Sequence, residues 1–110
     1  MNRTRFDPGT AQRAHAGTIL ASGVLPEGVK APFEHAWGYL DGPGEMERHS
    51  HHKEEVYFFF AGHGYVVVGE ERQLVGPGDV VEIPPDALHT VGNESDGQLL
   101  WAALWWDVEG

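Results

Sequence analysis

The 110-residue sequence predicts an all-β protein, arranged as a sandwich or barrel of short strands. Fifteen glycines and seven prolines are spread along the chain, so turns recur at short intervals. Between the turns lie about nine or ten short segments rich in β-branched and aromatic residues, and no segment shows a convincing helical period. The tight turns require mostly antiparallel pairing. At this length there is room for one domain, 1–110, with one core.

The turns divide the chain into a series of expected elements. Residues 1–14 carry three arginines and little apolar pattern, so we expect them to be loose or docked against a partner subunit. Two prolines make 24–32 a loop, and the unbroken apolar run in 55–61 predicts a central strand buried on both faces. The expected strands cover residues 18–21, 33–40, 45–51, 55–61, 65–68, 73–75, 80–83, 88–91 and 99–106.

The last of these strands is unusually apolar and contains Trp101, Trp105 and Trp106. Such a segment does not suit the edge of a monomeric sheet. It lies either inside the protein or against a second subunit.

The charge balance excludes several classes of partner. Seventeen acidic residues against seven basic ones give a formal net charge of -10, which repels nucleic acid and anionic lipid surfaces.

The absence of cysteine excludes disulfides, cysteine-based zinc sites and thiol catalysis. The start of the chain has no apolar leader, and the longest apolar run, 99–106, is too short to span a membrane. A cytoplasmic location is therefore expected.

A histidine-rich stretch near the middle of the chain carries the candidate chemistry. His49 and His51 are two residues apart, so on a strand both rings leave the same face. On one straight strand Glu55 would lie roughly 20 Å from His49, so the chain must bend across the polar residues 52–54 for the carboxylate to approach. Two imidazoles and a carboxylate at one point could hold a divalent metal ion.

The spacing of these residues resembles the first of two motifs of the cupin family, which are small double-stranded β-helix (jelly-roll) barrels. Residues 44–62 fit G-x5-H-x-H-x3,4-E-x6-G as His49-x-His51-x3-Glu55-x6-Gly62, although Gly44 is one residue too near His49. Residues 78–93 fit the second motif, G-x5-P-x-G-x2-H-x3-N. Its matching positions are Gly78, Pro84, His89 and Asn93, with Asp86 in place of the motif's glycine. The fifteen residues between the motifs resemble the short spacer of small microbial cupins.

The resemblance implies that His49, His51, Glu55 and His89 are metal ligands. It also implies one divalent transition metal ion per chain (Fe, Mn, Zn, Ni, Co or Cu), a small-molecule ligand in the barrel, and a homodimer. The implied dimer favours a second subunit over the interior as the partner of the apolar segment 99–106. Two functions remain open. One is an enzyme acting on a small oxygenated metabolite as a dioxygenase, a decarboxylase or an isomerase. The other is a non-catalytic module that binds or senses a small molecule through the same metal.

Tyr57 is the candidate catalytic residue outside the ligand set. It follows Glu55 at an even spacing, so both side chains share a face of the strand, and its hydroxyl is a potential proton donor with an ordinary pKa near 10. We interpret His35 as a satisfied strand histidine, His63 as an exposed turn residue and Asn93 as a residue that ties down a turn. His15 has no assigned role.

Overall fold

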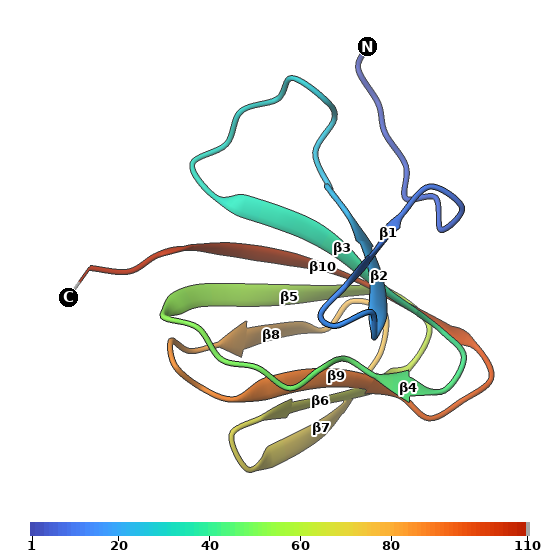
Figure 1. The fold of residues 1–110 in the computed structure, drawn as a ribbon, viewed down its shortest axis with the longest axis vertical. Coiled ribbons are helices and arrows are strands. Elements are labelled where there is room, and N and C mark those ends of the chain that lie inside the picture. Colours follow the sequence, from blue (N-terminus) through green and yellow to red (C-terminus); the bar gives the residue numbers. More distant parts are fainter. Residues whose placement is uncertain (110) are drawn as a thin grey trace.

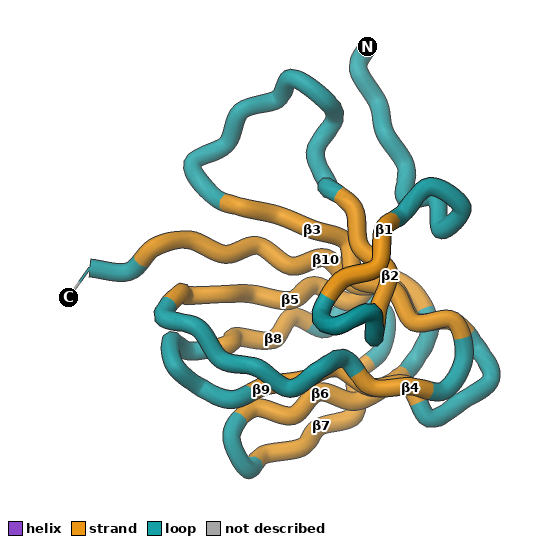
Figure 2. The backbone as a smooth tube through the Cα atoms, in the orientation of Figure 1, coloured by secondary structure: helices purple, strands orange, loops and turns teal. Residues whose placement is uncertain are grey.

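The computed structural model describes residues 1–109, which form ten strands in two antiparallel sheets (Figure 1). Figure 2 shows that strands and loops account for this whole part of the chain, so it holds no helix that could span a membrane. The strands are β1 Gln12–Ala14, β2 Ile19–Ser22, β3 Glu34–Asp41, β4 Gly44–Glu45, β5 Lys53–Ala61, β6 Gly64–Val68, β7 Glu71–Val75, β8 Val80–Ile83, β9 His89–Asn93 and β10 Gln98–Asp107.

The two sheets face each other across one core. The larger sheet has the order β1-β2-β3-β10-β5-β8 and the smaller one β4-β9-β6-β7. In Figure 1, β3, β10, β5 and β8 lie side by side above β9, β6 and β7. Both sheets contribute side chains to the core, which includes Ile19, Leu40, Met46, Tyr57, Phe59, Val66, Val75, Ile83, Val91, Leu99, Trp101 and Ala103. The all-β fold predicted from the turn pattern is confirmed.

The apolar C-terminal strand lies inside the larger sheet. β10 pairs with β3 on one side and with β5 on the other, and Trp101 is 1% exposed. Burying a side chain of this size stabilises the fold by about 3 kcal/mol. The preference for a second subunit over the interior is therefore wrong for most of this segment. Only Trp106, near its end, is exposed.

Strand β5 is buried on one face rather than on both. Glu55, Tyr57 and Phe59 point inward, whereas Phe60 is 53% exposed. The register between β5 and β10 shifts at this point, because Trp101 pairs with Phe59 and its neighbour Leu100 pairs with Ala61. Phe60 falls in this β-bulge, and its ring lies on the outer face of the sheet, 5.2 Å from the ring of Trp37.

The N-terminal segment packs on its own chain, so the expectation of a loose or subunit-docked segment is wrong for much of it. β1 pairs with β2 as the edge of the larger sheet. The Phe6 ring lies 5.1 Å from the ring of Tyr39 and 6.1 Å from that of Trp37. The pairing of β1 with β2 also places the turn between these strands beside His49.

The strand predicted over 45–51 is much shorter than expected. Only Gly44 and Glu45 form β4, and the regular ladder stops there. The backbone N–H of Glu47 bonds the hydroxyl of Thr18, and its carbonyl accepts a hydrogen bond from the His49 ring. Side chains thus use the backbone groups that a continued ladder would need. The segment still runs beside β9, which positions the candidate site.

Candidate metal centre

His49 and His89 are paired through their backbones. The N–H of His49 donates to the carbonyl of His89 at 3.2 Å, and the N–H of His89 donates back at 2.9 Å. In such an antiparallel pair both side chains leave the same face, here with their ring centroids 4.3 Å apart. This bridge brings together the two sequence motifs, which lie forty residues apart.

Backbone carbonyls fix the orientation of both rings. His49 Nδ1 donates to the Glu47 carbonyl at 2.9 Å, and His89 Nδ1 donates to the Ala87 carbonyl at 2.8 Å. Because a carbonyl only accepts, each Nδ1 carries the proton and each Nε2 offers its lone pair. His89 Nε2 is buried and has no hydrogen-bond partner. Nitrogen atoms held in this way are typical of metal ligands.

His51 and Glu55 complete the cluster. The donor nitrogens of His49, His51 and His89 all lie within 4.8 Å of one another. Glu55 Oε1 lies 3.1 Å from His51 Nε2 and 3.3 Å from His89 Nε2. The chain bends at His52, as predicted, although β5 begins earlier than expected, at residue 53. The structure therefore brings the four predicted ligands together, with mixed nitrogen and oxygen donors that suit a divalent transition metal ion.

Burial and a neighbouring imidazole keep His49 in the neutral form that can bind a metal cation. Burial lowers the pKa of His49, and the neighbouring His89 acts in the same direction. A lowered pKa holds this imidazole in the neutral form, the only form with a lone pair to donate. Glu55 is 5% exposed, so its carboxyl group supplies the buried oxygen donors of the cluster.

The loop before β9 tolerates the departure from the second motif. Asp86 stands where the motif has glycine, and it adopts a left-handed backbone with φ 68°. Aspartate is among the few non-glycine residues that enter this region readily. Its N–H donates to the His51 carbonyl at 2.8 Å, and its carboxylate lies 3.0 Å from His52 Nδ1. The substitution therefore preserves the loop and links it to the first motif.

Tyr57 lies in the core beside the cluster, on the same face of β5 as Glu55. Burial raises the pKa of its phenol well above 10, and the charge and hydrogen bond of Glu55 raise it further. The phenol therefore stays neutral and acts as a donor toward the carboxylate rather than as a base.

The other residues interpreted from the sequence, His35, His63 and Asn93, lie outside the cluster of candidate ligands. His35 Nδ1 accepts a hydrogen bond from the Val24 N–H at 2.9 Å, so this strand histidine is satisfied as predicted. His63 is exposed in the turn after β5, again as predicted. The Asn93 amide donates to the carbonyls of Gly42 and Gly97, which ties down the turn after β9.

A cavity of about 270 Å³ is lined by three of the four candidate ligands, His49, His51 and Glu55. Most of its wall is apolar, formed by Ile19, Ala21, Ala36, Met46, Trp101, Ala103 and Trp105. Lys53 lies at its edge and is paired with Asp107. Concave apolar sites with a few convergent polar groups are the usual form of small-molecule sites.

His15 is the neighbour of the site that sequence reasoning missed. It lies in the β1–β2 turn, lines the cavity, and places its ring centroid 4.3 Å from that of His49. Burial lowers the pKa of His15 most, and the neighbouring His49 lowers it further. No sequence motif surrounds His15, and its position depends on the pairing of β1 with β2. The only sequence signal for a role at the site was therefore that the residue is a histidine.

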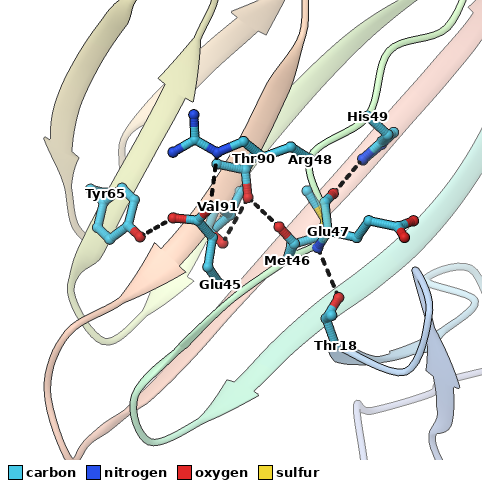
Figure 3. A network of polar contacts seen from close by, with 9 residues as sticks. All are labelled: Thr18, Glu45, Met46, Glu47, Arg48, His49, Tyr65, Thr90 and Val91. Atoms are coloured by element: carbon cyan, nitrogen blue, oxygen red, sulfur yellow. Dashed lines mark hydrogen bonds and ion pairs between the residues drawn. The ribbon is translucent and has the colours of Figure 1, made fainter.

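A polar network supports the segment that carries His49 (Figure 3). The Thr90 hydroxyl donates to the Met46 carbonyl at 2.5 Å, and the Met46 N–H donates to the Val91 carbonyl at 2.9 Å. Nearby, Glu45 accepts hydrogen bonds from Arg48 and from the Tyr65 hydroxyl. These contacts replace the missing ladder and hold the segment against β9.

Comparison with known proteins agrees with this fold. Residues 38–107, more than half of the chain, match the sequence model of the Cupin domain family. The protein therefore belongs to the cupin family.

Solved structures show the same fold. A Cupin 2 conserved barrel domain protein from Salinispora arenicola CNS-205 is 29% identical, with a TM-score of 0.85 over 98% of this chain and 90% of its own. The plu4264 protein from Photorhabdus luminescens is 28% identical, with a TM-score of 0.82 over 97% and 89%. A predicted oxalate decarboxylase from Thermotoga maritima is 18% identical, with a TM-score of 0.72 over 82% and 81%, and shows the fold alone. No curated protein matches the sequence.

Proposed function

We propose that this cupin binds one divalent transition metal ion through His49, His51, Glu55 and His89 and acts on a small oxygenated molecule. One observation carries the proposal: three imidazoles and a buried carboxylate converge, and two of the rings are held by backbone carbonyls with Nε2 free to coordinate. Such an ion would supply Lewis-acid or redox chemistry to the bound molecule. Four protein donors leave two positions of a six-coordinate ion for adjacent oxygen atoms of the substrate.

The chain's own residues define the substrate further. The cavity is small, and its wall is mostly aliphatic and aromatic, so the preferred molecule has a chelating oxygenated end and an apolar body. No arginine is among the described residues that line the cavity, and Lys53 is paired with Asp107. A small dianion would therefore lack a free cation beside the metal, so the oxalate specificity predicted for the Thermotoga maritima protein is not the one we propose.

Tyr57 and Glu55 have related roles in this proposal. The neutral phenol donates a hydrogen bond to the carboxylate and fixes its orientation toward the metal position. Tyr57 also lines the cavity, and because its single O–H is directed to Glu55, its hydroxyl oxygen is the candidate acceptor of a hydrogen bond from a bound substrate. Its raised pKa excludes it as a general base near neutral pH.

A non-catalytic binding or sensing module is the second candidate function. One observation favours it: apart from the four ligands and His15, the ionisable side chains among the described cavity residues are Tyr57 and Lys53. The first has a raised pKa and the second is held in an ion pair, so neither is suited to transfer protons. A binding module needs only the metal and the apolar wall.

Metal content tests the site. We expect one divalent ion per chain in purified protein by elemental analysis, and His51→Ala should remove most of it because a donor nitrogen is lost. His52→Ala is the matched control, because its side chain faces Asp86 on the surface and should leave the content unchanged. Equal losses in both variants would place the metal elsewhere in the histidine-rich stretch.

The choice between the two functions needs a second experiment. Metal-loaded protein is mixed with a panel of diketones, catechols and hydroxy acids, and binding is followed by calorimetry. Oxygen uptake and products are followed with an electrode and by mass spectrometry. Binding with turnover supports the enzyme, and oxygen dependence separates a dioxygenase from a decarboxylase or an isomerase. Binding without any product would support the module instead.

A further inference from the structure

His15 has an unusual backbone for a non-glycine residue. Its φ is 51°, and the next residue, Ala16, has φ 58°, so two consecutive side-chain-bearing residues adopt the left-handed conformation before Gly17. This conformation is disfavoured for L-residues and persists only where the surrounding structure enforces it. Such outliers occur in tight hairpin turns and also concentrate at functional sites.

The turn is tied to the segment that carries the metal ligands. The Thr18 hydroxyl donates to the His15 carbonyl at 2.6 Å and accepts the Glu47 N–H at 2.9 Å. The link between Thr18 and Glu47 is visible in Figure 3. Since Glu47 also holds the His49 ring through its carbonyl, one short chain of hydrogen bonds fixes His15 relative to His49.

The His15 ring lies between the cavity and solvent, and its nitrogen atoms have no hydrogen-bond partner in the protein. The residue is exposed, yet it lines the cavity and contacts the His49 ring. Within residues 1–109 no protein group forms a hydrogen bond with either of its ring nitrogens. The turn thus presents an imidazole without a protein hydrogen-bond partner at the mouth of the site.

We propose that His15 is a substrate-contacting residue, which forms a hydrogen bond with an oxygen atom of the small molecule held at the metal centre. The inference rests on the proposed function, because it places the oxygenated end of that molecule beside His49. The imidazole selects ligands with an oxygen atom at the cavity mouth, while the apolar wall accepts the rest of the molecule.

The test uses metal-loaded protein and two probes. Acetylacetone offers two oxygen atoms, whereas pyridine binds a metal through nitrogen and has no oxygen. His15→Asn removes the ring but suits the left-handed backbone, so the turn is expected to persist. We expect unchanged metal content, about tenfold weaker acetylacetone binding through loss of one hydrogen bond, and unchanged pyridine binding. Ala16→Gly, at an exposed neighbour that is also left-handed, should leave both affinities unchanged.

Other outcomes would overturn the inference in distinguishable ways. Loss of metal in His15→Asn would make His15 a further ligand. Equal weakening of both probes would show that it acts by holding the His49 ring. Full metal content with unaltered acetylacetone affinity would overturn the inference alone, whereas a wild-type protein that takes up no metal would overturn the proposed function with it.

Discussion

At the scale of single residues, burial controls the ionisation of every tyrosine in the chain. Burial is the largest cause of the raised pKa of Tyr39, Tyr57 and Tyr65. Tyr65 also donates a hydrogen bond to Glu45, and its pKa is raised to about 12. The fold therefore favours the neutral phenols, so their contribution to stability is full below pH 10 and is lost as pH rises through the folded-state values.

A tyrosine titration checks this expectation. In the native protein, near-ultraviolet phenolate absorbance should be nearly absent at pH 10, and the Tyr65 step should have its midpoint at about 12. In denaturant all three phenols should titrate near the ordinary value of about 10. Tyr65→Phe should remove the step near 12. A native transition centred at 10 would contradict the hydrogen-bonded, partly buried environment of Tyr65.

The candidate ligands could be predicted from the sequence because their spacing is local within each motif. Their donor atoms could not, since the orientation of the His49 and His89 rings depends on carbonyl groups and on a backbone bridge across forty residues. His15 was missed for the same reason. Its place beside His49 follows from tertiary pairing of the N-terminal hairpin and from no pattern in the residues around it.

At the scale of elements, the contact between β3 and β10 shapes the floor of the cavity. Gly38 pairs with Trp101, and the indole lies across the glycine. A Cβ atom at position 38 would lie 2.3 Å from Trp101 Cε2, well inside van der Waals contact. The absence of a side chain on β3 therefore makes room for the largest buried side chain of β10.

Gly38→Ala should consequently destabilise the protein. Either the indole or the strand must move, and overpacking of this kind costs about 2–3 kcal/mol in the free energy of unfolding. Urea denaturation measures the change. Gly23→Ala is the control, because its added Cβ would meet only the His35 ring at 3.5 Å, and its effect should stay within about 0.5 kcal/mol. Equal stability of the two variants would mean that the indole relaxes without cost.

Most strands could be placed from the sequence because turns and apolar runs are local signals. Two expectations failed where distant groups decided the outcome. The strand over 45–51 is interrupted because Thr18, far away in sequence, takes the N–H of Glu47. Strand β5 has an outer face that the rest of the chain covers only in part, with Phe60 exposed, and an all-apolar run does not show which face stays uncovered.

At the scale of the whole molecule, we predict a homodimer. The N-terminal segment no longer supports this, since Phe6 packs within its own chain, but Phe60 and Trp106 remain exposed on the larger sheet. Light scattering coupled to size exclusion should give about twice the chain mass of 12.1 kDa. Phe60→Ser should reduce the dimer fraction, whereas Val29→Ser, at an exposed loop residue, should not. A mass near 12.1 kDa at micromolar concentration would exclude the dimer.

The position of Trp101 gives this protein an optical reporter of its own site. Of the four tryptophans in the chain, Trp101 and Trp105 line the cavity, whereas the Trp37 ring packs against Phe6 and Phe60. Indole emission depends on local polarity and is quenched by nearby paramagnetic ions, so the emission of Trp101 and Trp105 should change when a metal ion or a small molecule binds. Binding of an ion or a small molecule in the cavity can therefore be followed by intrinsic fluorescence, without a label. The close packing of Trp101 at the floor of the cavity, which excludes water there, also provides this fluorescence signal.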